Sequence, residues 1–313
     1  MAASTDLFAR RNRVRIVVVV LVAALNYVLA VALAAVTATL VLIIAAMFNF
    51  DIFPSDADSL AWFAYGIGGI CAVAFVIGFL TALVRIPTAR RKLEERVLNE
   101  TIARIVRDDS HREVRNLLDG LAIAAGIATP RFAMISDPSP NSFGVGTRPK
   151  NAIIAITNGL VDHLSRDELE AVLAYEVTRI KSYDVALASW TVALTGGAID
   201  SGSGLFSWLP YRIALALQVW ALRDQGTERD RAAVRFTRNP QSLVHALEKL
   251  DNDQTQVASV SRATAPLWIE FPAKALSGDS SRATRVLRRS LLLDERIAAL
   301  RELAHMPPAG ATT

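Results

Sequence analysis

Two long apolar stretches dominate the first third of the chain. Residues 16–48 are interrupted only by one Asn, one Tyr and two Thr, and residues 60–84 form a second apolar run. A bilayer core needs about 20 helical residues, so each run is long enough to cross a membrane, the first one with a tilt or a protruding end. Between them, residues 51–58 form a short acidic turn. The pattern predicts an amino-terminal transmembrane hairpin within residues 1–87.

Basic residues flank this hairpin on its outer ends. Four arginines lie between Arg10 and Arg15, three arginines and a lysine lie between Arg85 and Lys92, and the turn between the spans has no Lys or Arg. Cytoplasmic flanks of membrane helices carry an excess of Lys and Arg. We therefore expect a multi-pass protein of the cell (inner or plasma) membrane, with both ends of the hairpin and the bulk of the chain in the cytosol.

The rest of the chain alternates helical and extended patterns. An N-terminal capping box at Ser165 and Glu168 predicts a helix that runs to about Lys181. Apolar stretches at 185–222 predict a membrane-associated hairpin that spans the bilayer, re-enters it or packs on its face. The other expected elements are an amphipathic helical region at 88–126, strands at 131–136 and 152–157, a closing helix at 293–303 and a tail at 307–313. The fold class is thus α+β: a mostly α-helical integral membrane protein with a small β-sheet in its cytosolic domain, residues 88–306.

Composition supports a membrane protein and narrows its partners. Hydrophobic residues make up 52% of the 313, the mean hydropathy is +0.32, and the net charge is +4. The basic residues flank apolar segments or lie on predicted helices without interleaved aromatics, so the expected anionic neighbour is membrane lipid and not nucleic acid. The single cysteine, Cys71, excludes an internal disulfide and a cysteine-based zinc site. In the second span, Gly66, Gly68 and Gly69 are predicted close-packing positions.

The helix at 169–181 carries a resemblance to a known family. Its sequence, Leu-Glu-Ala-Val-Leu-Ala-Tyr-Glu-Val-Thr-Arg-Ile-Lys, resembles the catalytic helix of HtpX-type (CAAX prenyl protease-like) membrane zinc metalloproteases, which reads roughly L-x-x-V-L-A-H-E-x-x-H-I. In that motif two His four residues apart bind zinc, and the adjacent Glu activates the zinc-bound water as general base. This chain keeps the Glu as Glu176 but has Tyr175 and Arg179 where the two His belong.

Three further segments resemble the same family in the same order. They are residues 139–160, which resemble the family's strand-edge segment and following strand, residues 230–240, which resemble the helix of the third ligand, and residues 293–300, which resemble the closing helix. The resemblance covers roughly residues 95–305 and implies a zincin-like domain. Counting back from Asp230 places the third ligand, a Glu in relatives, at Gly226. The resemblance also implies that Asp184 and Asp230 orient a ligand residue or have a structural role.

The substituted ligand positions lead us to expect a pseudoprotease without zinc. Glycine has no side chain to offer, arginine is a permanent cation, and tyrosine would have to bind as phenolate. We expect Arg179 to pair with Glu176, or alternatively to reach Asp230. An active metalloendopeptidase with an atypical site remains the alternative reading.

Several roles fit a non-catalytic member of the family. The chain could act as a scaffold, a regulator or a subunit of a membrane complex, as a homo- or hetero-oligomer, with membrane proteins or an active paralogue as partners. The resemblance implies a setting in membrane protein quality control. A peptide could dock by β-augmentation along the strand edge at Asn141, Phe143 and Gly144.

Overall fold

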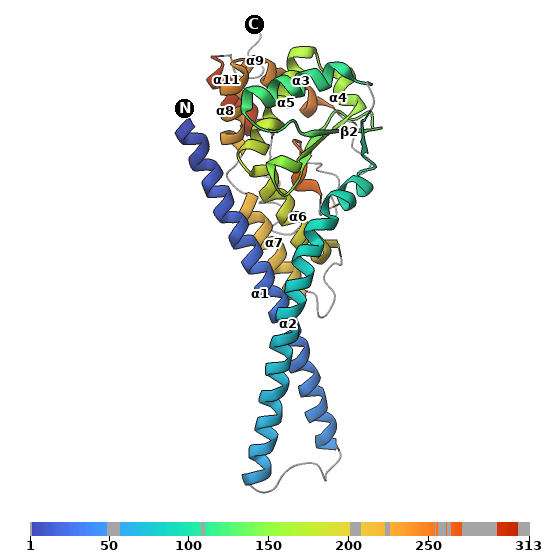
Figure 1. Cartoon of the computed structure of the whole chain (residues 1–313), viewed down its shortest axis with the longest axis vertical. Helices are drawn as coiled ribbons and strands as arrows, with labels where there is room; N and C mark the ends of the chain where they lie inside the picture. Colours follow the sequence, from blue (N-terminus) through green and yellow to red (C-terminus); the bar gives the residue numbers. More distant parts are fainter. Residues whose placement is uncertain are drawn as a thin grey trace.

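The chain forms a helical hairpin joined to a compact domain. A computed structural model describes residues 2–48, 57–107, 110–200, 208–222, 226–253, 255, 261, 264–270 and 293–305. In chain order the elements are α1 (Ala2–Phe48), α2 (Ala57–Glu100), β1 (Arg104–Ile105), α3 (Arg112–Ala125), β2 (Arg131–Ile135), β3 (Ser142–Val145), η1 (Pro149–Asn151), β4 (Ile153–Thr157), α4 (Asn158–His163), α5 (Arg166–Lys181), α6 (Asp184–Asp200), α7 (Trp208–Leu222), α8 (Gly226–Thr237), α9 (Pro240–Asn252), η2 (Ala265–Leu267) and α11 (Leu293–Leu303). Figure 1 shows α1 and α2 extending away from the domain and crossing part-way along their length.

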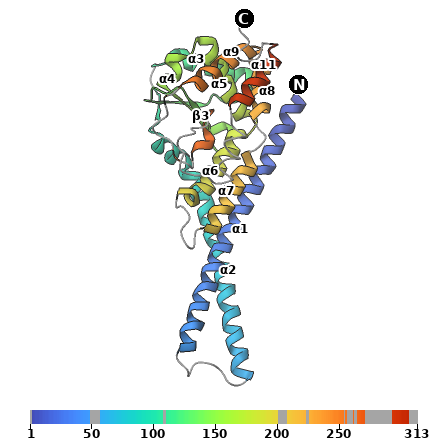
Figure 2. The same ribbon diagram turned by 180° about the vertical axis from the view of Figure 1, so that it is seen from behind.

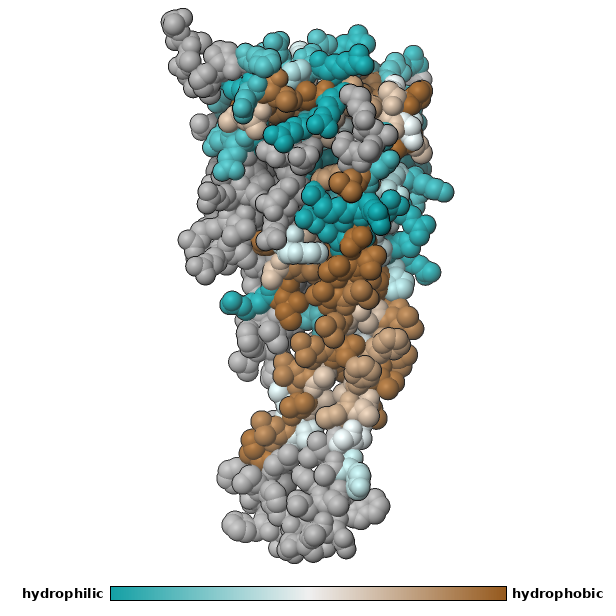
Figure 3. Space-filling view, turned by 90° about the vertical axis from the view of Figure 1, so that its left-hand side faces the viewer, coloured by the Kyte–Doolittle hydropathy of each residue, from teal (hydrophilic) through white to brown (hydrophobic). Residues whose placement is uncertain are grey.

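The two long helices match the expected membrane spans. Apolar windows within 6–40 of α1 and 68–100 of α2 are long enough to cross a bilayer, and only 11% and 17% of these windows are buried. Their large apolar side chains therefore face outward, and Figure 3 shows them as a hydrophobic band below a hydrophilic domain. Such a band suits lipid and not water. Residues 49–56, which include most of the expected acidic turn at 51–58, lie outside the described residues, as does the expected tail at 307–313.

The helices α6 and α7 lie alongside this hairpin. Figures 1 and 2 show both helices between the diverging upper parts of α1 and α2. Asn12 of α1 donates from Nδ2 to the backbone oxygen of Ser182 at 2.9 Å, and Arg15 donates to the backbone oxygen of Ala221 at 3.3 Å. These two hydrogen bonds join the first part of α1 to the domain, and the Ser182 contact lies next to the turn that precedes α6.

A four-stranded mixed sheet forms the centre of the domain, in the order β1-β2-β4-β3. β2 and β4 are parallel, and β1 and β3 are antiparallel to their neighbours. Side chains alternate along β4, so Ile154 and Ile156 pack toward α3 and α5, while Ile153 and Ala155 pack toward α6 and η2. The sheet is therefore buried on both faces, and its edge strand β3 lies beside α5.

Two details differ from the sequence-based expectations. The helical region predicted at 88–126 is broken: α2 ends at Glu100, Ile102 has a positive φ of 54°, and β1 follows before α3 begins. Pairing of β1 with β2 outweighs the helical periodicity there. The predicted packing glycines are also wrong, because a Cβ on Gly66 would meet nothing within 4 Å. The close approach of α1 and α2 occurs at Gly78, where a Cβ would lie 2.8 Å from the Val28 Cα.

Candidate functional site

The helix α5 carries the residues of interest and begins where the sequence predicts. The Ser165 hydroxyl accepts from the Glu168 backbone N–H, and the Glu168 carboxylate accepts from the Ser165 backbone N–H at 2.7 Å, which completes a capping box. Lys249 of α9 also donates to this carboxylate at 2.7 Å. The fixed start sets the register of α5, and the whole helix from Glu168 to Ile180 is buried except for Glu170.

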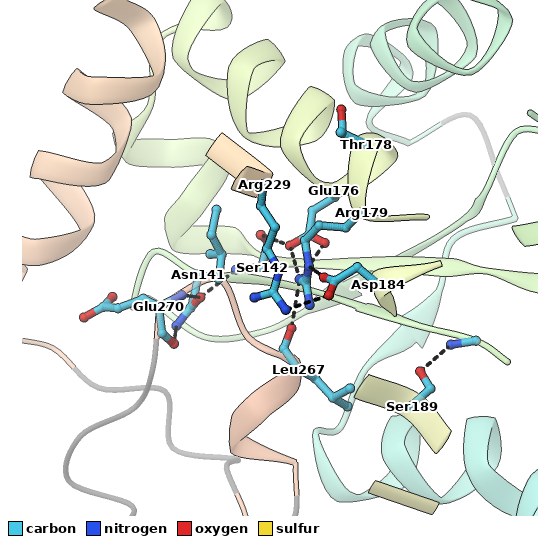
Figure 4. Close-up of polar contacts among 12 residues, drawn as sticks. Asn141, Ser142, Glu176, Thr178, Arg179, Asp184, Ser189, Arg229, Leu267 and Glu270 are labelled. Atoms are coloured by element: carbon cyan, nitrogen blue, oxygen red, sulfur yellow. Dashed lines mark hydrogen bonds and ion pairs between the residues drawn. The ribbon is translucent and has the colours of Figure 1, made fainter. Parts of the chain in front are cut away.

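Arg179 stands at the centre of a buried ion-pair network (Figure 4). Its side chain is 1% exposed. One terminal nitrogen, Nη1, donates to both Glu176 oxygens at 3.0 and 3.2 Å and to the backbone oxygen of Leu267 at 3.1 Å, while Nε donates to Asp184 at 2.9 Å. The prediction that Arg179 pairs with Glu176 is confirmed. The guanidinium also joins α5 to the first residue of α6 and to the last residue of η2.

A second arginine completes the coordination of Asp184. Arg229 of α8 donates from Nη2 to Asp184 Oδ1 at 2.6 Å, so this carboxylate lies between two guanidiniums. Tyr183 has a positive φ of 60°, and the chain turns there so that Asp184 faces back toward α5. Burial acts to raise the pKa of Asp184, but the charges of Arg229 and Arg179 outweigh it and hold that pKa below the usual range.

A third arginine pairs with the other predicted carboxylate. Arg296 of α11 donates to both oxygens of Asp230 at 2.8 and 2.9 Å, so the alternative in which Arg179 reaches Asp230 is wrong. The ring of Tyr175 lies close to both arginines, with its centroid 5.1 Å from the Arg296 Cζ and 5.7 Å from the Arg179 Cζ. Tyr175 therefore makes a cation–π contact with each arginine.

Glu176, the retained general-base position, is fully enclosed. Its carboxylate is 0% exposed and accepts from Arg179 and from the Ser142 hydroxyl, the latter at 3.1 Å. Burial raises the pKa of Glu176, and the Arg179 charge and the Ser142 hydrogen bond oppose that rise. A Cβ on Gly144 would come within 3.1 Å of Glu176 Oε2 and 2.7 Å of a Val185 methyl. Strand β3 therefore runs directly against the carboxylate, and only glycine fits there.

The described side chains do not fit a zinc ion. Zinc takes three or four neutral or anionic ligands from Cys, His, Asp or Glu. No group of three such residues gathers anywhere in the described part of the chain. Around Arg179, three arginines instead form ion pairs with the carboxylates of Glu176, Asp184 and Asp230. A guanidinium has no lone pair with which to bind a metal. Gly226, the third substituted ligand position, is the first residue of α8, one turn before Arg229 and Asp230.

The chain was compared with known proteins, and the matched segment includes α5 and α8. The family model described as Peptidase family M48 matches residues 108–304. The chain belongs to peptidase family M48. It is 30% identical over 253 residues to the "Protease HtpX homolog" of Dictyoglomus turgidum, covering 73% of this chain and 82% of that protein. It is 32% identical over 249 residues to the protein of the same name from Streptococcus gordonii, covering 70% and 82%. This M48 chain is thus a member of the HtpX-type branch.

Some site residues were not found from the sequence. Arg229 and Arg296 lie beside matched motif positions, and no local pattern marks either as a partner of Asp184 or Asp230. The Leu267 backbone oxygen has no sequence signal at all, because any residue supplies one. The peptide-edge residues Asn141 and Phe143 do lie at the outer edge of the sheet, but Phe143 already forms an antiparallel bridge with Trp268.

Proposed function

We propose that this M48 protein is a catalytically inactive HtpX-type membrane pseudoprotease that serves as a scaffold, regulator or subunit of a membrane complex. The observation that carries the proposal is the buried Arg179, which stands at a metal-ligand position of the family motif and binds the general-base Glu176. A permanent cation replaces the neutral imidazole that would hold a zinc ion.

The surroundings of Glu176 argue against its acting as a base. A general base needs a water molecule within hydrogen-bond reach and a free lone pair to receive the proton. Both Glu176 oxygens accept from Arg179, one also accepts from Ser142, and the carboxylate has no exposed surface. The three guanidiniums neutralise the three carboxylates, so the network has no net negative charge that would attract a divalent cation.

The retained framework supports a binding role at the membrane. The apolar faces of α1 and α2 remain exposed and can contact lipid or other membrane helices. By the resemblance, the partner class is membrane proteins undergoing quality control, or an active paralogue, in a homo- or hetero-oligomer. The basic residues between Arg10 and Arg15 and between Arg85 and Lys92 support a position of the domain on the cytosolic face of the cell membrane.

Metal content tests this proposal most directly. The full chain is purified in detergent, exposed to zinc, washed, and subjected to elemental analysis, and the same samples are incubated with unfolded casein. We expect no retained zinc and no cleavage. About one zinc ion per chain, the ratio of a specific site, would overturn the proposal. Bound zinc that disappears in Glu176→Gln together with casein cleavage would instead establish the atypical metalloendopeptidase.

A further inference from the structure

A short segment of the chain lies along the outer edge of β3. Trp268 forms an antiparallel bridge with Phe143, and their rings meet edge to face with centroids 4.8 Å apart. The Ile269 N–H donates to the backbone oxygen of Ser142 at 2.9 Å. Residues Leu267–Glu270, called the inner strap below, thus occupy the edge at which an added strand would pair.

The inner strap is held by backbone hydrogen bonds in addition to its buried side chains. Besides the Ile269 N–H bond, Asn141 brackets Glu270: its Nδ2 donates to the Glu270 backbone oxygen at 3.2 Å, and its Oδ1 accepts from the Glu270 N–H at 3.3 Å. These contacts do not depend on the side chains of the inner strap. Recognition of backbone groups beside an edge strand is how grooves bind extended peptides of varied sequence.

Two buried arginines hold backbone oxygens of the same segment. Arg179 donates to the Leu267 oxygen at 3.1 Å, and Arg296 donates to the Ile269 oxygen at 2.9 Å. Arg179 is oriented by the carboxylates of Glu176 and Asp184, Arg296 is oriented by both oxygens of Asp230, and each arginine is at most 3% exposed. Charge-assisted hydrogen bonds from fixed, desolvated donors are stronger than neutral ones. Arg179, at a metal-ligand position of the family motif, and Arg296 of α11 therefore provide two carbonyl-binding positions.

The geometry points to a peptide-binding site formed by Asn141, Ser142, Arg179 and Arg296, with the inner strap as its resident ligand. This inference rests on the proposed function, since it requires arginine and not zinc at the centre. Leu267, Trp268 and Ile269 are at most 2% exposed. Ile269 packs in the hydrophobic core on the α5 side of the sheet, and Leu267 and Trp268 pack in the core on the α6 side, so the site is filled in the native chain. An extended peptide binds there only when the inner strap is displaced, and partners of the intact protein bind elsewhere.

The site is tested with a labelled copy of its own ligand. A fluorescein-labelled peptide Ala-Pro-Leu-Trp-Ile-Glu, the sequence of residues 265–270, is titrated against the full chain in detergent, with empty micelles as background. The native chain is expected not to bind it. In Trp268→Gly/Ile269→Pro the bridge and the Ile269 N–H are lost, and we expect saturable binding. Adding Asn141→Ala to that variant removes two hydrogen bonds and is expected to weaken binding by about tenfold or more.

A matched control separates displacement of the inner strap from general loosening. Val244→Ala/Leu247→Ala removes two fully buried side chains of α9, which share a hydrophobic cluster with Ile269 but contribute no residue to the proposed site, and this variant should not bind the peptide. Equal binding by the native chain or by this control would overturn the inference. A folded Trp268→Gly/Ile269→Pro variant that does not bind would overturn it too. Zinc content measured in the same samples decides the proposed function independently.

A disulfide variant tests the proposed peptide-binding site if Trp268→Gly/Ile269→Pro does not fold. The Ile269-to-Ser142 hydrogen bond makes Phe143 and Trp268 a non-hydrogen-bonded pair, with Cα atoms about 4.5 Å apart, which suits a disulfide. In Phe143→Cys/Trp268→Cys with Cys71→Ser we expect a disulfide, no peptide binding when oxidised, and binding when reduced. No disulfide, or the same binding in both states, contradicts the assignment.

Discussion

Replacing Arg179 by methionine tests whether the network stabilises the fold as the structure implies. The substitution keeps most of the side-chain volume but leaves Glu176 with only the Ser142 hydroxyl and removes one of two partners of Asp184. Breaking a buried ion pair from one side costs about 3–5 kcal/mol, because an uncompensated charge stays buried. For a chain of this size we expect the unfolding temperature to fall by roughly 10 °C.

The assay is thermal unfolding of the full chain in detergent across a range of pH. Burial raises the pKa of Glu176 and Arg179 opposes that rise, so Arg179→Met should raise the pKa further. A carboxyl whose pKa is higher in the folded than in the unfolded chain loses stability as pH rises between the two values. The difference between variant and native chain should therefore grow from acid toward neutral pH. The additional change Glu176→Gln should recover part of the loss and flatten this pH dependence.

Two results would refute the reasoning. The exposed Arg148 serves as the control, since Arg148→Met removes an equal charge from the surface and should change the unfolding temperature little. If Arg179→Met lowers the unfolding temperature no more than Arg148→Met, the network does not stabilise the fold. If Glu176→Gln adds its own loss to that of Arg179→Met, the two residues are not coupled.

Two further predictions concern the neighbours of this network. Burial, together with Asp251 and Asp253, raises the pKa of Glu270 to about 8, so stability should fall as pH rises from the unfolded value of 4.5 toward 8, by at most roughly 5 kcal/mol. Glu270→Gln should remove this fall in pH-dependent thermal unfolding, and an unchanged pH profile would contradict it. Gly144→Ala should destabilise the folded chain by about 1–3 kcal/mol, because the added Cβ meets Val185 and Glu176. The control Gly120→Ala adds a Cβ to open space in the middle of α3 and should stabilise the folded chain by up to about 1 kcal/mol. Equal changes of the unfolding temperature in the two variants would show that the space at Gly144 is not limiting.

Local signals predicted the elements that the site is built on. The Ser165–Glu168 capping box and the apolar positions after it lie within a few residues of each other, so the sequence alone places the start of α5 and the register of Glu176 and Arg179. Short β-prone runs bounded by Pro, Gly and Asn likewise predicted β2 and β4. The helix expected at 88–126 failed at residues 101–107, because the pairing of β1 with β2 is a contact between segments about 30 residues apart that no local periodicity records.

The partners of the network could not be predicted for the same physical reason. Arg229 reaches Asp184 over 45 positions, Arg296 reaches Asp230 over 66, and Arg179 reaches the Leu267 oxygen over 88. Many arginines in the sequence are compatible with an exposed position. Identifying the one that pairs with Asp184 or with Asp230 requires knowing which helix ends lie together, and only the folded structure shows this. The one pair found from the sequence, Glu176 with Arg179, is separated by a single helical turn.

The positions of the three arginines explain how the domain keeps its arrangement with the family's ligand residues replaced. In the family motif the ligands come from α5 and α8, so a metal would join these two helices. Here Asp184 receives Arg179 from α5 and Arg229 from α8, and therefore joins the same two helices through the first residue of α6. Arg296 adds α11 through Asp230 and also binds the Ile269 oxygen. Because these links consist of guanidiniums and carboxylates, a chelator should leave the unfolding temperature of the native chain unchanged, whereas Asp184→Asn should lower it by loosening both helices at once.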